Sequence, residues 1–171
     1  MIAGKLRNAA ILMLFISTAA HAQNHMVFLL RHAEKSAEPA SDPGLTEIGT
    51  ARAENLALRL ANAKPAAVFT SQYRRTQLTA LPLAAASGIS VTVVPIEKAT
   101  AAEYPQQLLA RICALPADAS AVVIGHSNTI PAIAEAWTAH PVRPIADDEY
   151  NRILIIKLKD CHAVESLDLR Y

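Results

Sequence analysis

The sequence predicts a single-domain α/β protein, a three-layer sandwich with a mainly parallel sheet and an antiparallel C-terminal strand. Strand-like apolar runs alternate with helix-like segments along the chain, which is typical of βαβ units. The last two apolar runs, 152–158 and 163–171, follow one another without a helix, so we expect them to pair antiparallel. A chain of 171 residues with 52% hydrophobic and 18% charged residues, and with no repeat or linker, is consistent with one packed domain.

The N-terminal segment has the features of a secretory signal peptide. Lys5 and Arg7 precede an apolar run over 9–20, and Ala20-His21-Ala22 offers small residues for cleavage. A membrane anchor is the alternative, but the run is shorter than the roughly 20 residues that span a bilayer. We therefore predict a signal peptide over 1–22, a mature domain over 23–171 without a membrane anchor, and a periplasmic or secreted location.

The charge balance argues against nucleic acid as a partner. Cleavage would remove Lys5 and Arg7 and change the net charge from +1 to −1. Without a basic excess, nucleic acid is not attracted by charge, and any anion site must be built from a local cluster of cations. Cys113 and Cys161 do not form a C-x-x-C pair, and their spacing leaves open whether they are bonded to each other.

The elements can be justified in chain order from their patterns. Met26–Leu30 is a run of five apolar residues and predicts a buried strand, followed by a polar loop over 36–44. Thr46 can cap a helix over 45–63. The remaining predictions, in order, are a strand over 66–71, a helix over 75–88 with a kink at Pro82, a strand over 89–95, a helix over 103–115, a strand over 120–126, a helix over 129–139 and the two final strands.

Polar residues gather where three of the predicted strands end. Residues 31–32 are Arg-His, residues 70–71 are Thr-Ser with two arginines at 74–75, and residues 125–128 are Gly-His-Ser-Asn. Parallel neighbouring strands end at the same edge of a sheet, where ligands bind and where helix N-termini favour anions. Arginine forks match phosphate oxygens. The sequence therefore predicts a phosphate site at this edge, with Ser127 among the binding residues.

Four segments together resemble the histidine phosphatase superfamily, which has the phosphoglycerate mutase-like fold. They are RHAEK at 31–35, DPGLTEIGTARA at 42–53, SQYRRTQLTA at 71–80 and VVIGHSNTIP at 122–131. The resemblance implies that His32 is the nucleophile that forms a phosphohistidine intermediate. It also implies that Arg31 and Arg75 clamp the phosphate and that His126 is the second active-site histidine.

The chemistry explains why these residue types are needed. Phosphoryl transfer depends on positioning and on stabilising charge that is spread over the phosphoryl oxygens. His32 must attack through an unprotonated nitrogen, which nearby arginines favour by lowering its pKa. A backbone carbonyl is the expected partner of its other ring nitrogen. We therefore expect an enzyme, a phosphoric monoester or phosphoramidate hydrolase, with a small phosphorylated substrate and without cofactor or metal.

The general acid is the least defined part of the predicted site. Glu97 and Glu103 both lie in the stretch where larger family members carry a Glu, and Glu103 fits the spacing better. Some small members lack this acid and act on phosphoramidates or other good leaving groups. Glu38 stands where mutases carry an Asn, which argues against a mutase.

Three other functions are each suggested by part of the sequence. Residues 125–129 resemble a serine-hydrolase elbow with Ser127 as nucleophile and His162 as an available base, but Thr129 replaces the second Gly. A zinc deaminase is suggested by His32-Ala33-Glu34 but lacks the P-C-x-x-C segment. An exported module that binds phosphoanions without turnover is the non-enzymatic alternative.

Overall fold

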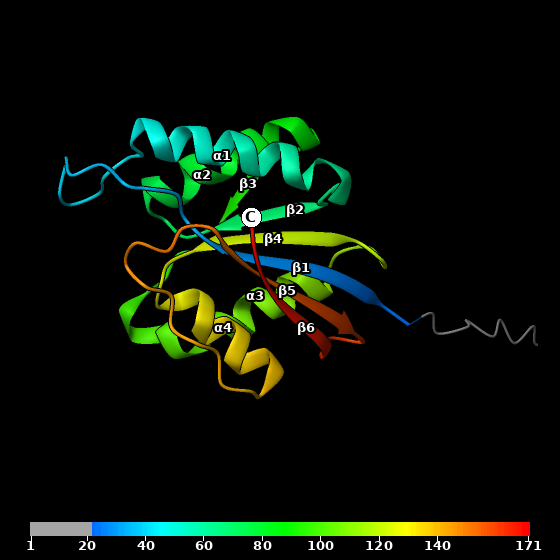
Figure 1. The fold of residues 1–171 in the computed structure, drawn as a ribbon. Coiled ribbons are helices and arrows are strands. Elements are labelled where there is room, and N and C mark those ends of the chain that lie inside the picture. Colours follow the sequence, from blue (N-terminus) through cyan, green and yellow to red (C-terminus); the bar gives the residue numbers. More distant parts are fainter. Residues whose placement is uncertain (1–21) are drawn as a thin grey trace, which may run out of the picture.

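A computed structural model describes residues 22–171 of the chain. The predicted signal peptide therefore lies, apart from Ala22, outside the described residues. Six strands form one sheet in the order β3-β2-β4-β1-β5-β6 (Figure 1). The elements are β1 (Asn24–Arg31), α1 (Glu47–Leu60), β2 (Ala67–Thr70), α2 (Arg74–Ser87), β3 (Val91–Val93), α3 (Tyr104–Cys113), β4 (Ser120–Gly125), α4 (Thr129–Thr138), β5 (Arg152–Lys159) and β6 (His162–Arg170).

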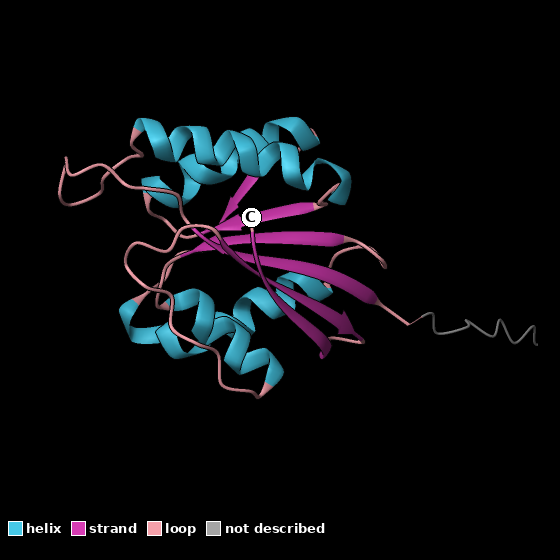
Figure 2. Ribbon diagram, in the orientation of Figure 1, coloured by secondary structure: helices cyan, strands magenta, loops and turns pink. Residues whose placement is uncertain are grey.

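The sheet topology confirms the predicted fold class. β1, β2, β3 and β4 are parallel to one another, while β5 runs antiparallel to both β1 and β6. Helices α1 and α2 cover one face of the sheet, and α3 and α4 cover the other (Figure 2). This is the three-layer arrangement that alternating strands and helices predict.

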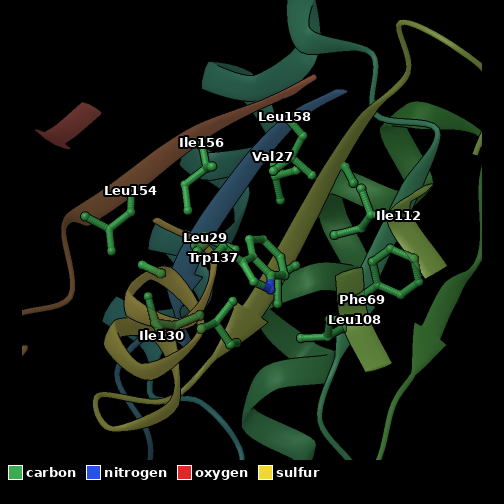
Figure 3. Close-up of a cluster of buried hydrophobic side chains, with 14 of the residues drawn as sticks. Val27, Leu29, Phe69, Leu108, Ile112, Ile130, Trp137, Leu154, Ile156 and Leu158 are labelled. Carbon is green, nitrogen blue, oxygen red and sulfur yellow. The ribbon is translucent and has the colours of Figure 1, made fainter. Parts of the chain in front are cut away.

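Each face of the sheet has its own hydrophobic core. On the α3 and α4 side, Leu29 of β1 packs with Ile130 and Trp137 of α4 (Figure 3). On the α1 and α2 side, Leu30 of β1 packs with a second group that includes Leu56. Successive residues of a strand point to opposite faces, so one buried strand supplies both cores. The central position of β1 explains why its apolar run does not alternate with polar residues.

The start of α1 is fixed against the segment that follows β1. Thr46 caps the helix, its hydroxyl accepting from the Gly49 N–H at 3.0 Å, as predicted. A side chain at Gly49 would overlap the backbone carbonyl of Glu34. The Glu34 carboxylate accepts from Nε and Nη2 of Arg52 in a bidentate pair. These contacts hold residue 34, two positions beyond His32, in one place.

The two cysteines are bonded to each other, which answers the question that their spacing left open. Cys113 ends α3 and Cys161 lies in the turn between β5 and β6, with their Cα atoms 5.8 Å apart. The bond therefore ties a helix to the hairpin that forms the edge of the sheet.

Most boundaries agree with the prediction to within about two residues, and two features differ. The strand expected over 89–95 is reduced to 91–93, and residues 98–103 form a 3₁₀ helix that no pattern predicted. Within residues 22–171, no helix is both long enough and apolar enough to cross a membrane.

Candidate active site

The three polar strand ends lie at one edge of the sheet. In the parallel register, Arg31 of β1 lies opposite Gly125 of β4, and Thr70 of β2 lies opposite Ile124 of β4. The His32 N–H donates to the Gly125 carbonyl at 2.9 Å, so the ladder continues to the first histidine. The predicted convergence of these segments is therefore present.

His32 and His126 form the centre of the cluster. Their ring centroids are 5.4 Å apart, and both residues are buried, with 4% and 8% of their surface exposed. Nδ1 of His32 lies 2.7 Å from the Ala33 carbonyl oxygen, which can only accept a hydrogen bond. Nδ1 therefore carries the proton of the neutral ring, and Nε2 has the free lone pair that a nucleophile requires.

The ring of His126 has the opposite assignment. Nη2 of Arg75 donates to Nδ1 at 3.4 Å, so Nδ1 is an acceptor without a proton. The proton is then on Nε2, which donates to the Ser71 hydroxyl at 2.9 Å. Ser71 in turn donates to Thr76 Oγ1 at 3.0 Å, and Thr76 donates to the Tyr73 carbonyl at 2.8 Å. This chain of hydrogen bonds has one direction from ring to backbone.

Burial and neighbouring cations keep both rings neutral. Burial is the largest cause that lowers the pKa of His32 to about 4, and Arg31, Arg75 and Lys35 add to the effect. Burial likewise comes first in lowering the pKa of His126 to about 3, followed by Arg75, His32 and Arg31. No carboxylate of the described residues is among the groups that shift either pKa.

Arg31 has two tasks in the structure. Its Nη1 donates to the carbonyls of Ala146, Asp147 and Glu149 at 2.7, 2.9 and 3.2 Å, and Nη2 donates to the Tyr150 hydroxyl at 3.4 Å. Nε is buried and has no partner within residues 22–171. Arg31 therefore holds the loop before β5 through Nη1 and keeps Nε available for an anion.

Arg75 has a similar division of its nitrogens. Nη1 lies 4.0 Å from the Asp42 carboxylate, and Nη2 donates to His126. Its Nε is buried and has no partner in the described part of the chain. Two buried guanidinium N–H groups without acceptors, one from each predicted clamp residue, are what an anion site requires before its ligand is bound.

Two tyrosines that the sequence did not single out complete the cluster. The Tyr73 ring lies 5.3 Å from His126, and the Tyr150 ring lies 6.2 Å from His32. The guanidinium of Arg75 is 4.4 Å from the centre of the Tyr73 ring, and that of Arg31 is 4.1 Å from the centre of the Tyr150 ring. Tyr73 stands beside the arginines in sequence, but no sequence signal marks Tyr150.

Two further residues named from the sequence, Ser127 and His162, make no hydrogen bond to the cluster of histidines and arginines. Ser127 is half-buried, and no hydrogen bond of its hydroxyl occurs within residues 22–171. His162 starts β6, whose pairing with Lys159 places it at the opposite end of the sheet from Ser127. No triad is therefore assembled from Ser127 and His162, which weakens the serine-hydrolase alternative.

The two candidate general acids are both exposed. Glu97 precedes the 3₁₀ helix and Glu103 ends it, and neither side chain bonds to another described residue. Glu103 as general acid therefore stays a prediction. Across residues 22–171, no three His, Cys, Asp or Glu side chains are grouped so that they could hold a metal ion.

Comparisons with known proteins give the same picture. Residues 27–96 match the histidine phosphatase superfamily (branch 1), a range that includes Arg31, His32 and Arg75 but not His126. No curated protein matches the sequence. Among solved structures, a mycobacterial glucosyl-3-phosphoglycerate phosphatase is similar, with 17% identity, 88% of this chain and 99% of that chain covered, and a TM-score of 0.64.

Two further structures share the fold. The protein histidine phosphatase SixA in complex with tungstate is 19% identical, with 85% of this chain and 96% of that chain covered and a TM-score of 0.65. A candidate SixA from Agrobacterium tumefaciens is 23% identical, with 83% and 96% covered and a TM-score of 0.57. Residues 27–96, which carry Arg31, His32 and Arg75, are therefore similar to the histidine phosphatase superfamily, and the chain shares the fold of these solved phosphatase structures.

Proposed function

We propose that this protein is a phosphatase that hydrolyses phosphomonoesters or phosphoramidates through a phosphohistidine intermediate on His32. The observation that carries the proposal is the tautomer of His32. Its Nδ1 proton is held by the Ala33 carbonyl, which leaves a nucleophilic Nε2 beside two arginines whose buried Nε groups have no partner in the described chain. A phosphoryl group supplies both the electrophile and the missing acceptors.

The steps follow from these contacts. His32 Nε2 attacks phosphorus, the bond to the leaving group breaks, and the arginines stabilise the charge on the phosphoryl oxygens. Water then attacks the phosphohistidine and releases inorganic phosphate. Because burial and cations lower the pKa of His32 to about 4, the nucleophile is unprotonated throughout the neutral range.

The surroundings of the histidines favour substrates with good leaving groups. No carboxylate of the described residues is among the charged groups that shift the pKa of either ring, and within residues 22–171 Glu103 has no side-chain bond that would direct it toward the rings. A phosphoramidate or an aryl phosphate needs less help from an acid than an alkyl phosphate does. One structural neighbour is named as a protein histidine phosphatase, which agrees with this substrate range.

Oxyanion complexes of the neighbours support phosphate binding. The mycobacterial phosphatase is known with vanadate and with inorganic phosphate, and SixA with tungstate. The Cys113–Cys161 bond supports a periplasmic or secreted location, because structural disulfides persist in oxidising compartments. The cleavage of residues 1–22 is part of the same proposal and would be read from the N-terminus of the mature protein.

Turnover of p-nitrophenyl phosphate by the mature protein, measured from pH 4 to 8, tests the proposal. We expect His32→Ala to lose at least about a thousandfold in kcat, because the nucleophile is removed. Acid-quenched enzyme should carry a phosphoryl group on His32. His162→Ala is the matched control, since this exposed histidine lies at the far end of the sheet. Turnover that survives His32→Ala would contradict the mechanism.

Two results would favour the alternatives. Tight vanadate binding without turnover would identify a phosphoanion-binding module, and labelling of Ser127 by a fluorophosphonate would identify a serine hydrolase.

The Glu103→Gln variant tests the general acid separately. If Glu103 donates the proton, kcat for an alkyl phosphate should fall about 10²–10⁴-fold, and that for p-nitrophenyl phosphate much less. Equal rates for wild type and variant on both substrates would remove Glu103 from the mechanism. Glu97→Gln provides the matched comparison.

A further inference from the structure

The loop before β5 decides which donors of Arg31 a ligand can meet. Nη1 of Arg31 donates to three carbonyls of residues 146–149, and Nη2 donates to the Tyr150 hydroxyl. Nε is buried and has no partner within residues 22–171. The contacts with the loop therefore take up one end of the guanidinium and leave the Nε–H for an anion.

The ring of Tyr150 lies against the same guanidinium. The carbon Cζ of Arg31 is 4.1 Å from the ring centre, and only 6% of the surface of Arg31 is exposed. A cation–π contact is stronger when the cation is desolvated, as it is here. A flat ring against the planar guanidinium also limits how far that group can tilt. The hydrogen bonds of Nη1 and the contact with the ring together restrict the direction in which Nε points.

Tyr150 is itself held by the C-terminal hairpin. The Tyr171 hydroxyl donates to the Tyr150 carbonyl at 3.3 Å. Arg152 of β5, which is 3% exposed, donates from Nη1 to the Arg143 carbonyl at 2.6 Å and pairs with Asp168 of β6. The position of the Tyr150 ring therefore depends on β5 and β6 and not on the loop alone.

The second arginine of the site is held less firmly. The guanidinium of Arg75 lies 4.4 Å from the centre of the Tyr73 ring, but its Nη1 is 4.0 Å from the Asp42 carboxylate, whose side chain is 36% exposed. No backbone carbonyl of the described residues accepts from the guanidinium of Arg75, whereas three accept from that of Arg31. Arg31 is thus the arginine whose orientation is fixed before a ligand binds.

We propose that Tyr150 is a positioning residue, whose ring holds the guanidinium of Arg31 so that Nε meets the phosphoryl oxygens in the transition state. This inference rests on the proposed function. Donors that are fixed before the reaction need no reorganisation as charge develops on those oxygens. Misplacement of such a group by about 1 Å can cost about a hundredfold in rate. The effect of Tyr150 on the rate passes through Arg31.

Substitutions at Tyr150 test the ring in the mature protein, with p-nitrophenyl phosphate and an alkyl phosphate as substrates. Tyr150→Phe keeps the ring, so kcat should stay within about threefold of wild type on both. Tyr150→Leu keeps an apolar side chain without a π face, so kcat should fall about 10–100-fold while KM changes less than about threefold. The loss should be the same for both substrates, because Arg31 acts on the phosphoryl group and not on the leaving oxygen.

A double-mutant cycle with Arg31→Lys tests whether Tyr150 acts through Arg31. Lysine keeps the positive charge but lacks the planar guanidinium. If the ring works by holding that group, adding Tyr150→Leu to Arg31→Lys should lower kcat by no more than about threefold. Losses that multiply would overturn the inference, because they would mean that the ring acts independently of Arg31, for example on His32, whose ring is 6.2 Å away.

The affinities for vanadate and phosphate give a measurement that needs no turnover. Vanadate can adopt the five-coordinate geometry of the transition state, whereas phosphate resembles the product. In calorimetry, Tyr150→Leu should weaken vanadate binding at least about tenfold and phosphate binding about threefold or less. Tyr171→Leu is the matched control, since the Tyr171 hydroxyl bonds to the Tyr150 carbonyl and not to Arg31, and it should leave both affinities unchanged.

The outcomes separate this inference from the proposed function. A loss in Tyr150→Phe as large as that in Tyr150→Leu would overturn the inference, since the hydroxyl and not the ring would be responsible. A Tyr150→Phe loss on the alkyl phosphate alone would also overturn it, by making the hydroxyl a proton donor to the leaving group. A wild type without turnover would instead overturn the proposed function, and the vanadate comparison would still test the positioning of Arg31. Circular dichroism confirms the fold of each variant, and Tyr150→Met replaces Tyr150→Leu if the latter does not fold.

Discussion

The neutral state of the two active-site imidazoles depends on burial more than on charge. The sequence led us to expect that the arginines lower the pKa of His32, because Arg31 precedes it and Arg75 is predicted to lie at the same edge of the sheet. In the structure, the loss of solvation is the larger cause for both His32 and His126, and the arginines add to it. A sequence shows which charges accompany a residue, but its depth in the fold depends on packing by distant segments.

These depressed pKa values make the stability of the protein depend on pH. In the unfolded chain a histidine takes up its proton near pH 6.5, but folded His32 and His126 remain neutral until about pH 4 and pH 3. The unfolded state binds more protons between these limits, so stability falls as the pH is lowered from 6.5 to about 4. Each ring contributes roughly 3 kcal/mol to the loss, at about 1.4 kcal/mol per pKa unit.

Urea unfolding at pH 7.5, 6, 5 and 4 in buffers without oxyanions measures this slope. We expect His126→Gln to reduce this slope by about half, since the glutamine does not titrate while His32 still does. The control is His162→Ala, which removes an exposed histidine. A slope that is the same in wild type and His126→Gln would mean that burial does not hold this imidazole neutral.

At the scale of elements, the start of α1 and the loop before β5 position the site. Arg31 holds the loop through three carbonyls, and Arg152 holds it through the Arg143 carbonyl at 2.6 Å while pairing with Asp168. The loop 36–44 contributes Asp42, which lies 4.0 Å from Arg75, and the loop 138–149 contributes the carbonyls to which Arg31 donates. Each of these two loops therefore contacts one of the two arginines of the candidate site.

The close approach of α1 to residue 34 predicts the effect of a substitution. In Gly49→Ala, the new Cβ would overlap the Glu34 carbonyl, so α1 must shift away from the segment that follows His32. We expect a loss of about 1–3 kcal/mol in the free energy of unfolding, together with a lower kcat. Thermal unfolding and p-nitrophenyl phosphate turnover measure the two effects.

Thr50→Ala is the matched control for this substitution, because it changes the neighbouring, exposed helix position. If Gly49→Ala were as stable as wild type, the contact between α1 and Glu34 would have to adjust at no cost, contrary to the structure.

At the scale of the whole molecule, the candidate site lies at one end of the sheet, and the disulfide lies at the other end, between α3 and the β5–β6 turn. The Cys113–Cys161 bond joins α3 to the β5–β6 turn across a separation of 48 residues. Removing it with Cys113→Ser and Cys161→Ser together should cost about 2–4 kcal/mol of stability, mainly because the unfolded chain gains freedom.

The serine variants should keep turnover at 25 °C, since neither cysteine contacts the histidines or arginines of the site. Unfolding of the wild type in the presence and absence of a reductant compares the protein without and with the Cys113–Cys161 bond, and it requires no mutation. Identical midpoints for oxidised wild type, reduced wild type and the double variant would rule out a stabilising bond.

Much of the fold and the centre of the site follow from local features of the sequence. Apolar periodicity predicts strands and helices because it reports which face of each element is buried. Placement of Arg31, His32, Arg75 and His126 together follows from one rule, that neighbouring parallel strands end at the same edge. The 3₁₀ helix at 98–103 could not be predicted, since its residues have no apolar period.

What the sequence by itself determined is the order of elements, the mainly parallel sheet and the meeting of the candidate phosphate-binding residues at one edge of that sheet. Only the tertiary structure decided which side chains bond to the ring nitrogens of His126, which donors of Arg31 bind the loop before β5, that Tyr150 joins the site and that the cysteines are bonded. The physical reason is sequence separation. Each of these features depends on a contact between residues that lie tens of positions or more apart in the chain, such as Arg31 and the Tyr150 hydroxyl. Such contacts arise from the packing of whole elements and leave no local pattern in the chain.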